Sequence, residues 1–121
     1  MPQTSSPPIA VADATPWTWV GQAEALSYQV RFYATEPALD ELAQTGGDRT
    51  VSITVNDRLY YPDLDLFGDH TSTIENAPPT LVHGGQWKIL RLGLGEKRVV
   101  FSAAQAGDPA GSTHYRIVVK T

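Results

Sequence analysis

The residues whose types and spacing suggest chemistry lie in the stretch DRLYYPDLDLFGDH, at positions 57–70. Its candidate metal ligands are the carboxylates of Asp63, Asp65 and Asp69, because Ca²⁺ prefers such hard oxygen ligands. An EF-hand loop that begins at Asp63 needs oxygen ligands at its positions 5 and 12, where this chain has Phe67 and Ile74. The EF-hand match therefore fails. We expect no metal site and interpret the stretch as a solvated acidic loop; a calcium loop of another geometry is the alternative.

The histidines suggest a second metal chemistry, which is zinc binding. His70 and His83 flank the same long connection, and Asp69 or Glu75 is available as a further ligand. No pair of histidines has the close spacing that brings two ligands together on one strand or helix. We therefore interpret the histidines as separate surface residues.

The sequence gives little support for nucleophilic catalysis or redox chemistry. The chain has no cysteine, which excludes disulfides, thiolate metal sites and a cysteine nucleophile. It also lacks the G-x-S-x-G sequence that exposes a catalytic serine in many hydrolases. We predict that the protein is not an enzyme and needs no cofactor.

Length and charge limit the class of protein and of partner. The chain has 121 residues, enough for one domain with its own core. Its formal net charge is -4, and its nine basic residues are scattered, with Lys97 and Arg98 as the densest cluster. A groove for nucleic acid needs more clustered positive charge, so we expect no nucleic acid as a partner.

The sequence also bears on the location of the protein. No apolar run approaches the roughly 18 residues of a membrane span, and we expect no membrane insertion. No signal peptide is visible at the N-terminus, because a basic region followed by an apolar one is missing. The protein is then either cytosolic or a module of a longer or exported chain. We predict the second, an extracellular or cell-surface location.

Alternation of apolar and polar residues predicts β-strands along most of the chain. The predicted strands are residues 17–20, 25–35, 50–55, 87–92, 98–103 and 113–120, with a returning segment RLYY, residues 58–61, after a turn at Asn56-Asp57. About seven short strands with turn signals between them are typical of an all-β, antiparallel, Ig-like β-sandwich. The sequence EPALDELAQTGGD adds a short helical turn near residues 37–44.

The strand pattern predicts a core and a domain boundary. The core residues are predicted to be Leu26, Tyr28, Val30, Phe32, Val51, Ile53, Val55, Phe101, Ile117 and Val119, with Val99 and Tyr115 also inward. The proline-rich residues 1–15 are predicted to form an extended arm that becomes ordered only near Pro16, and residues 16–121 a single domain.

The closing strands resemble those of bacterial Ig-like and cadherin-like β-sandwich modules. The residues that carry the resemblance are Leu92, Gly95, Val99, Phe101, Ala103, Gly107, Tyr115, Ile117 and Val119, and LSYQVRFYA and TVSITVND are similar to earlier strands of the same modules. Asp57 departs from the glycine usual in that turn, and the segment from Tyr61 to Gly85 is longer than a plain strand connection. The resemblance implies a structural or adhesive role in a multidomain surface protein, and it implies neither catalytic residues nor calcium sites.

The predicted function is accordingly that of a non-enzymatic module which makes protein–protein contacts, with a partner or by self-assembly. Its predicted partner-binding residues are Tyr60, Tyr61, Asp69, His70, Trp17, Trp19 and Tyr33, the last because it lies on the polar face of its strand. Aromatic side chains also stack on sugar rings, so a carbohydrate-binding module with a glycan partner is one alternative. A decoration protein of a virion or an appendage is the other.

Overall fold

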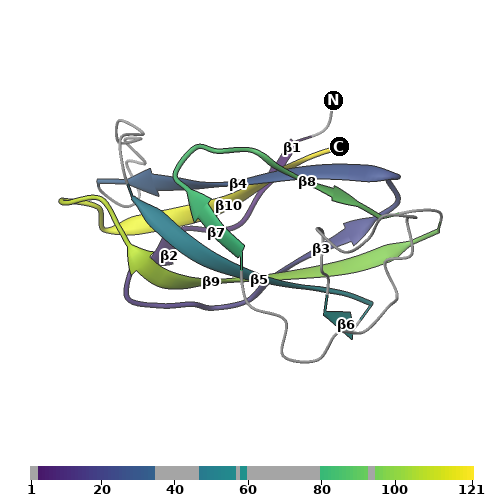
Figure 1. The fold of residues 1–121 in the computed structure, drawn as a ribbon, viewed down its shortest axis with the longest axis horizontal. Coiled ribbons are helices and arrows are strands. Elements are labelled where there is room, and N and C mark those ends of the chain that lie inside the picture. The colour runs from purple at the N-terminus through teal and green to yellow at the C-terminus, as the bar shows by residue number, and fades with distance from the viewer. Residues whose placement is uncertain (1–2, 35–46, 57, 60–79, 93–94) are drawn as a thin grey trace.

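Two antiparallel sheets packed face to face make up the fold. The structure is a computed structural model that describes residues 3–34, 47–56, 58–59, 80–92 and 95–121, to which the following account is confined. These residues form ten strands and no helix, so the predicted all-β sandwich is confirmed (Figure 1). The predicted helical turn near residues 37–44 lies outside the described residues.

The sheets have five strands each. Sheet A has the order β1 (Gln3–Ser5), β10 (His114–Lys120), β4 (Ala25–Tyr33) and β8 (Lys88–Arg91), with β2 (Ile9–Ala10) also paired to β10. Sheet B has the order β3 (Trp17–Gly21), β9 (Lys97–Gly107), β5 (Asp48–Val55) and β6 (Arg58–Leu59), with β7 (Thr80–His83) also paired to β5. In Figure 1, β4 and β8 lie along the top of the sandwich, and β5 and β9 lie along the bottom.

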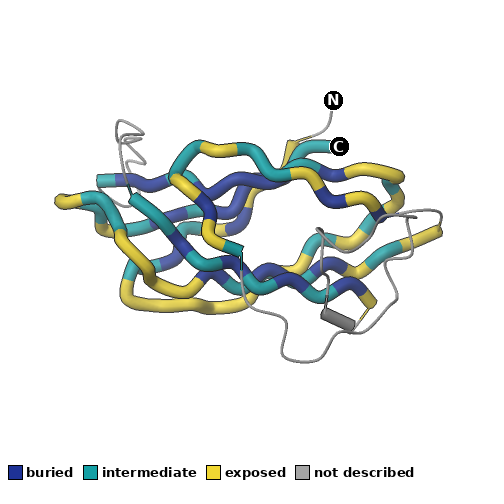
Figure 2. Tube along the Cα trace, in the orientation of Figure 1, coloured by how far each residue is buried: buried dark blue, intermediate teal, exposed yellow. Residues whose placement is uncertain are grey.

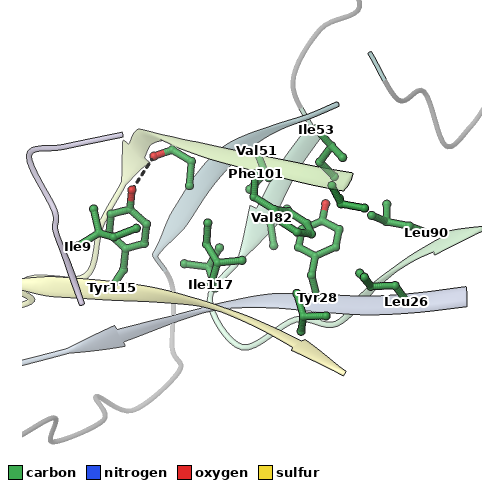
Figure 3. Packing of buried hydrophobic residues seen from close by; sticks show 14 of the residues in the cluster. Ile9, Leu26, Tyr28, Val51, Ile53, Val82, Leu90, Phe101, Tyr115 and Ile117 are labelled. Atoms are coloured by element: carbon green, nitrogen blue, oxygen red, sulfur yellow. Dashed lines mark hydrogen bonds between the residues drawn. The ribbon is translucent and has the colours of Figure 1, made fainter. Parts of the chain in front are cut away.

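The predicted alternation of side chains is confirmed on both sheets. All ten predicted core residues are buried, as are Val99 and Tyr115. Along β5, every second residue is buried, as Figure 2 shows, and β9 alternates in the same way up to Ala103. In β4 and β10 the inward residues are buried, but so are Gln29, Tyr33 and Val118 on the outer face. The Phe101 ring lies at the centre of this core, 5.2 Å from the Tyr28 ring and 6.0 Å from the Trp17 ring between centroids (Figure 3).

Two strands are longer than predicted by two residues or more, whereas the ends of the others differ from the prediction by at most two residues. β9 continues to Gly107, four residues beyond the predicted end, because residues 104–107 pair with the start of β5. Their sequence, AQAG, has no apolar–polar alternation that would predict a strand. β5 in turn begins at Asp48, two residues before the predicted start.

The predicted turn at Asn56-Asp57 joins β5 to β6, because Val55 pairs with Arg58. Asn56 has a φ of 50°, in the left-handed region that asparagine tolerates better than most residues. Its side-chain oxygen accepts a hydrogen bond from the Arg98 amide at 2.9 Å, which ties the turn to β9.

The N-terminal arm takes part in sheet A before the chain reaches Pro16. β1 and β2 both pair with β10, and Ile9 joins the core cluster. Between them, the buried Ser6 exchanges two bonds with Ile117: the Ser6 amide donates to the Ile117 carbonyl, and the Ser6 hydroxyl accepts from the Ile117 amide, both at 2.9 Å. Pro7 and Pro8 lack the N–H groups that would continue the ladder, which separates the two strands. Order therefore begins well before the predicted position near Pro16.

We predict that Ile117→Ala lowers the free energy of unfolding by about 2–5 kcal/mol, because it leaves a cavity in the core. The matched control is Ile89→Ala on β8, which removes the same atoms from a residue that is 59% exposed. Chemical denaturation of both variants measures the difference. Equal unfolding midpoints for the two variants would contradict the inward placement of Ile117.

Candidate functional site

The edges of the two sheets are the places where another chain can extend the fold. A strand at a sheet edge presents unpaired N–H and C=O groups, which are a template for pairing. Four edges arise from the described strands: β1 with β2, and β8, in sheet A; β3, and β6 with β7, in sheet B. Proteins commonly protect such edges with short strands, prolines or charged side chains.

Three of these edges have such protection. β1 and β2 have three and two residues, and Pro7 and Pro8 separate them. β8 has four residues, of which Lys88 and Arg91 are basic. β6 and β7 are short strands that pair with opposite ends of β5.

β3 differs from the other edges in combining a length of five residues with the absence of charge and proline. Its five residues, WTWVG, pair with β9 over their whole length and contain no charged side chain and no proline. Thr18 and Val20 point to the solvent side of sheet B, and Val20 is 58% exposed. β3 is therefore the strand best suited to accept another strand, and we take it as the candidate functional site.

The inward side of β3 is held by the core. The Trp17 ring stacks on Phe101 with an interplanar angle of 24°, and Trp17 and Trp19 both pack against the core cluster while staying half-buried. Gly21 provides room for the second indole, because a Cβ atom at Gly21 would lie 2.8 Å from the Trp19 Cζ2 atom. The two tryptophans thus fix the inward face of β3, and β9 is its one pairing partner among the described strands.

A buried ion pair anchors the segment that leads into β3. Arg49 lies on the inward face of β5, two residues before Val51, and is fully buried. Its Nε donates to Asp108 Oδ1 at 2.8 Å and its Nη2 donates to Asp108 Oδ2 at 3.0 Å, which is the bidentate geometry of a strong arginine–carboxylate pair. A register shift between Asp48 and Arg49 in the pairing with β9 marks a local irregularity of the ladder beside this residue.

The same guanidinium binds the backbone of the N-terminal segment. Arg49 Nη2 also donates to the Val11 carbonyl, and Nη1 donates to the carbonyls of Asp13 at 3.2 Å and Ala103 at 2.8 Å. Farther along, the Ser102 hydroxyl donates to the Ala14 carbonyl at 3.1 Å. Hydrogen bonds from Arg49 and Ser102 therefore hold residues 11–14 in place just before the chain enters β3.

Tyr115 completes this cluster. The Arg49 guanidinium lies 4.1 Å from the centroid of the Tyr115 ring, a cation–π distance. The Tyr115 hydroxyl is 2.9 Å from the Asp13 carbonyl and 3.1 Å from the Ala103 carbonyl, the second contact being the dashed line in Figure 3. Burial raises the pKa of Tyr115, and the positive charge of Arg49 opposes part of that rise.

Of the residues predicted to bind a partner, Trp17 and Trp19 lie on the β3 edge. Tyr33 was predicted to be exposed, and that prediction is wrong, because it is 7% exposed. It lies on the outer face of β4, opposite His114, and its ring centroid is 5.8 Å from the Arg116 guanidinium carbon. The other predicted partner-binding and metal residues, Tyr60, Tyr61, Asp63, Asp65, Asp69 and His70, lie outside the described residues.

The remaining histidines have local partners. His83 Nδ1 contacts the Asp48 carboxylate across β5 and β7, and His114 Nδ1 lies 2.9 Å from the Thr113 hydroxyl. Within the described ranges, no three histidine or acidic side chains lie close enough together to hold a metal ion.

Neither Arg49 nor Asp108 was predicted from the sequence to have a special role. The sequence did contain a signal that Arg49 is buried, because Arg49 continues the inward alternation of Val51, Ile53 and Val55. A charged side chain on the inward face needs a buried partner. The partner had no comparable signal, since Asp108 follows the end of β9 in a polar loop.

Comparison of the chain with protein-family models, with curated proteins and with solved structures finds no match. Among the described residues, no helix has the length and apolar character needed to cross a membrane.

We predict that Asp108→Ala lowers the free energy of unfolding by about 3–5 kcal/mol, because it leaves the Arg49 charge buried without its carboxylate. The control is Glu96→Ala, which removes an exposed carboxylate. In an Arg49→Met background, Asp108→Ala should cost much less, because no buried charge is left to be paired. Denaturant unfolding of the four variants tests this, and additive losses in the double variant would contradict it.

We also predict a pH effect from Tyr115. Its folded-state pKa is raised above the ordinary value of 10.0, so the folded protein keeps a proton that the unfolded chain releases. This contribution to stability is complete below pH 10 and is lost as the pH rises further. Tyr115→Phe should therefore show a smaller loss of unfolding free energy than the native protein between pH 9 and about 11. Parallel pH profiles for the two proteins would contradict the assignment.

Proposed function

We propose that this protein is a non-enzymatic structural or adhesive module, an Ig-like β-sandwich that makes protein–protein contacts within a surface assembly. The observation that carries the proposal is the β3 edge, which alone among the four edges of the described sheets is five residues long and free of charge and proline. The contact is made by strand addition, in which an extended segment of the partner pairs with β3 and continues sheet B.

Strand addition suits this edge for two physical reasons. The backbone groups of an added strand provide affinity, and the side chains at alternate positions provide specificity. Thr18 and Val20 are β-branched and Trp17 and Trp19 are aromatic, and cross-strand pairs of these types stabilise a ladder by roughly 0.2–1 kcal/mol each. Because the tryptophans already pack against the core, binding does not require them to be ordered from solution.

The Ig-like type is supported by the order of the strands. The chain changes sheet between β2 and β3, β3 and β4, β4 and β5, β7 and β8, β8 and β9, and β9 and β10. Such crossings between sheets occur in the Greek-key connections of Ig-like sandwiches. The resemblance of the last strands to bacterial surface modules favours a cell-surface or extracellular setting, and a virion or appendage decoration protein is the alternative setting for the same edge.

The carbohydrate-binding alternative has less support. Of the eight aromatic residues in the described part of the chain, none is fully exposed. The half-buried Trp87 has the Lys120 ammonium 4.0 Å from its ring centroid. An indole covered by a cation in this way presents less free face to a sugar ring.

A charge on β3 provides the test. Val20→Glu places a carboxylate at an exposed edge position opposite Arg98, so we expect this substitution to leave folding intact. The matched control is Ile89→Glu, because Ile89 is 59% exposed on the other well-exposed edge strand, β8. We expect Val20→Glu to weaken binding of an uncharged, fluorescent Val–Thr peptide at least about tenfold, as a loss of 1.4 kcal/mol would.

Fluorescence anisotropy measures the binding, and thermal unfolding checks that both variants are folded. The control variant should bind the peptide as the native protein does. Equal binding by Val20→Glu, or no binding by the native protein at concentrations where it is monomeric, would contradict strand addition at β3.

A further inference from the structure

We propose that the strand which adds to β3 is β3 of a second copy of this chain, in an antiparallel, two-fold symmetric dimer. This inference rests on the proposed function, because it uses the same edge and names its occupant. In the dimer, the two copies of sheet B become one continuous sheet that runs through the symmetry axis.

The charge of the segment favours a second copy as the occupant. In a two-fold interface, the same surface patch meets itself, so a charged strand brings like charges together. Directly opposed like charges destabilise an antiparallel pair. Residues 14–23, ATPWTWVGQA, contain no charged side chain, which makes β3 compatible with itself. The β8 edge, with Lys88 and Arg91, would meet its own positive charges.

The side chains fix a register. If Trp19 lies on the two-fold axis, all five residues of β3 are paired, with Trp17 opposite Gly21 and Thr18 opposite Val20 of the second copy. A large indole then faces a glycine, and two β-branched residues face each other on the outer side of the sheet. Moving the axis to Thr18 places Pro16, which has no N–H group, opposite Val20. The register centred on Trp19 avoids this loss.

The exposed apolar surface at β3 agrees with the proposed dimer. Val20, Leu81 and Ile89 are the three large apolar side chains that are well exposed among the described residues, and each lies on an edge strand. Val20 is the one whose strand also carries two half-buried tryptophans. The half-buried Trp17 and Trp19 flank it on the inward side, where a second strand would cover the rest of both indoles. Burial of this apolar surface adds to the backbone hydrogen bonds of the new ladder.

Disulfide trapping tests the register, because the chain has no cysteine of its own. Thr18→Cys and Val20→Cys are each prepared alone, then mixed and oxidised. Directly opposed residues of an antiparallel pair have Cβ atoms about 4.5–5.5 Å apart, close to the separation of a disulfide. We expect the mixture to form a disulfide-linked dimer of one Thr18→Cys and one Val20→Cys chain, at several times the yield of either variant alone.

Ile89→Cys, mixed with Thr18→Cys, is the matched control for random collision, because its side chain is as exposed as that of Val20. Sedimentation equilibrium adds a measurement without cysteine. The average mass of the native protein and of Ile89→Glu should rise with concentration toward that of a dimer, and that of Val20→Glu should stay monomeric.

The outcomes separate this inference from the proposed function. If the Val–Thr peptide binds at β3 but the mixed cysteine variants cross-link no better than the Ile89→Cys control, β3 accepts a foreign strand and the self-pairing is wrong. If Val20→Cys cross-links with itself more than with Thr18→Cys, the register is wrong. If neither peptide binding nor cross-linking occurs, both proposals fail.

Discussion

The buried pairing of Arg49 with Asp108 is the interaction on which the arrangement of this sandwich depends. A guanidinium between two sheets is costly to desolvate, and it is tolerated only where its N–H donors find acceptors. Here the acceptors come from three separate segments: the Asp108 carboxylate, the Ala103 carbonyl of β9, and the carbonyls of Val11 and Asp13. One side chain of β5 thus determines where the N-terminal segment and the loop after β9 must lie.

The edge that we assign to function follows from this anchoring. The chain leaves sheet A after β2 and must cross to sheet B before β3 begins, and the Arg49 cluster binds it during that crossing. Ser102 then binds the Ala14 carbonyl, and the Trp17 ring stacks on Phe101, so the strand enters its pairing with β9 from a fixed position. Because β9 is the one described strand that pairs with β3, these contacts determine its register on an otherwise open edge.

The sequence predicted the parts of the fold that depend on local periodicity. The long strands β4, β5 and β10 carry inward apolar residues at every second position, and all of these were identified from the sequence, whereas Arg49, which is also inward on β5, was not. Contacts between distant segments were not predictable in this way. Arg49 pairs with Asp108, which lies fifty-nine positions later in the chain. Tyr33 is buried on the face of β4 that the alternation assigns to solvent. At the candidate site, the two tryptophans were recognised from their types, whereas the edge position of β3 depends on the strand order of the whole sheet.

The lack of charge on β3 needs an explanation other than packing. Trp17 and Trp19 must be apolar, because they contact the core. Thr18 and Val20 point away from it, so folding places no such requirement on them. Of the two outward positions on each of the four-residue edge strands, β8 has Arg91 beside the exposed Ile89, and β7 has His83 beside the exposed Leu81, whereas neither outward position of β3 carries an ionisable side chain. An uncharged edge of five residues with no further partner among the described strands invites aggregation unless something pairs with it. A partner strand explains both the uncharged outward positions of β3 and its half-buried indoles. The stability of the single chain explains neither.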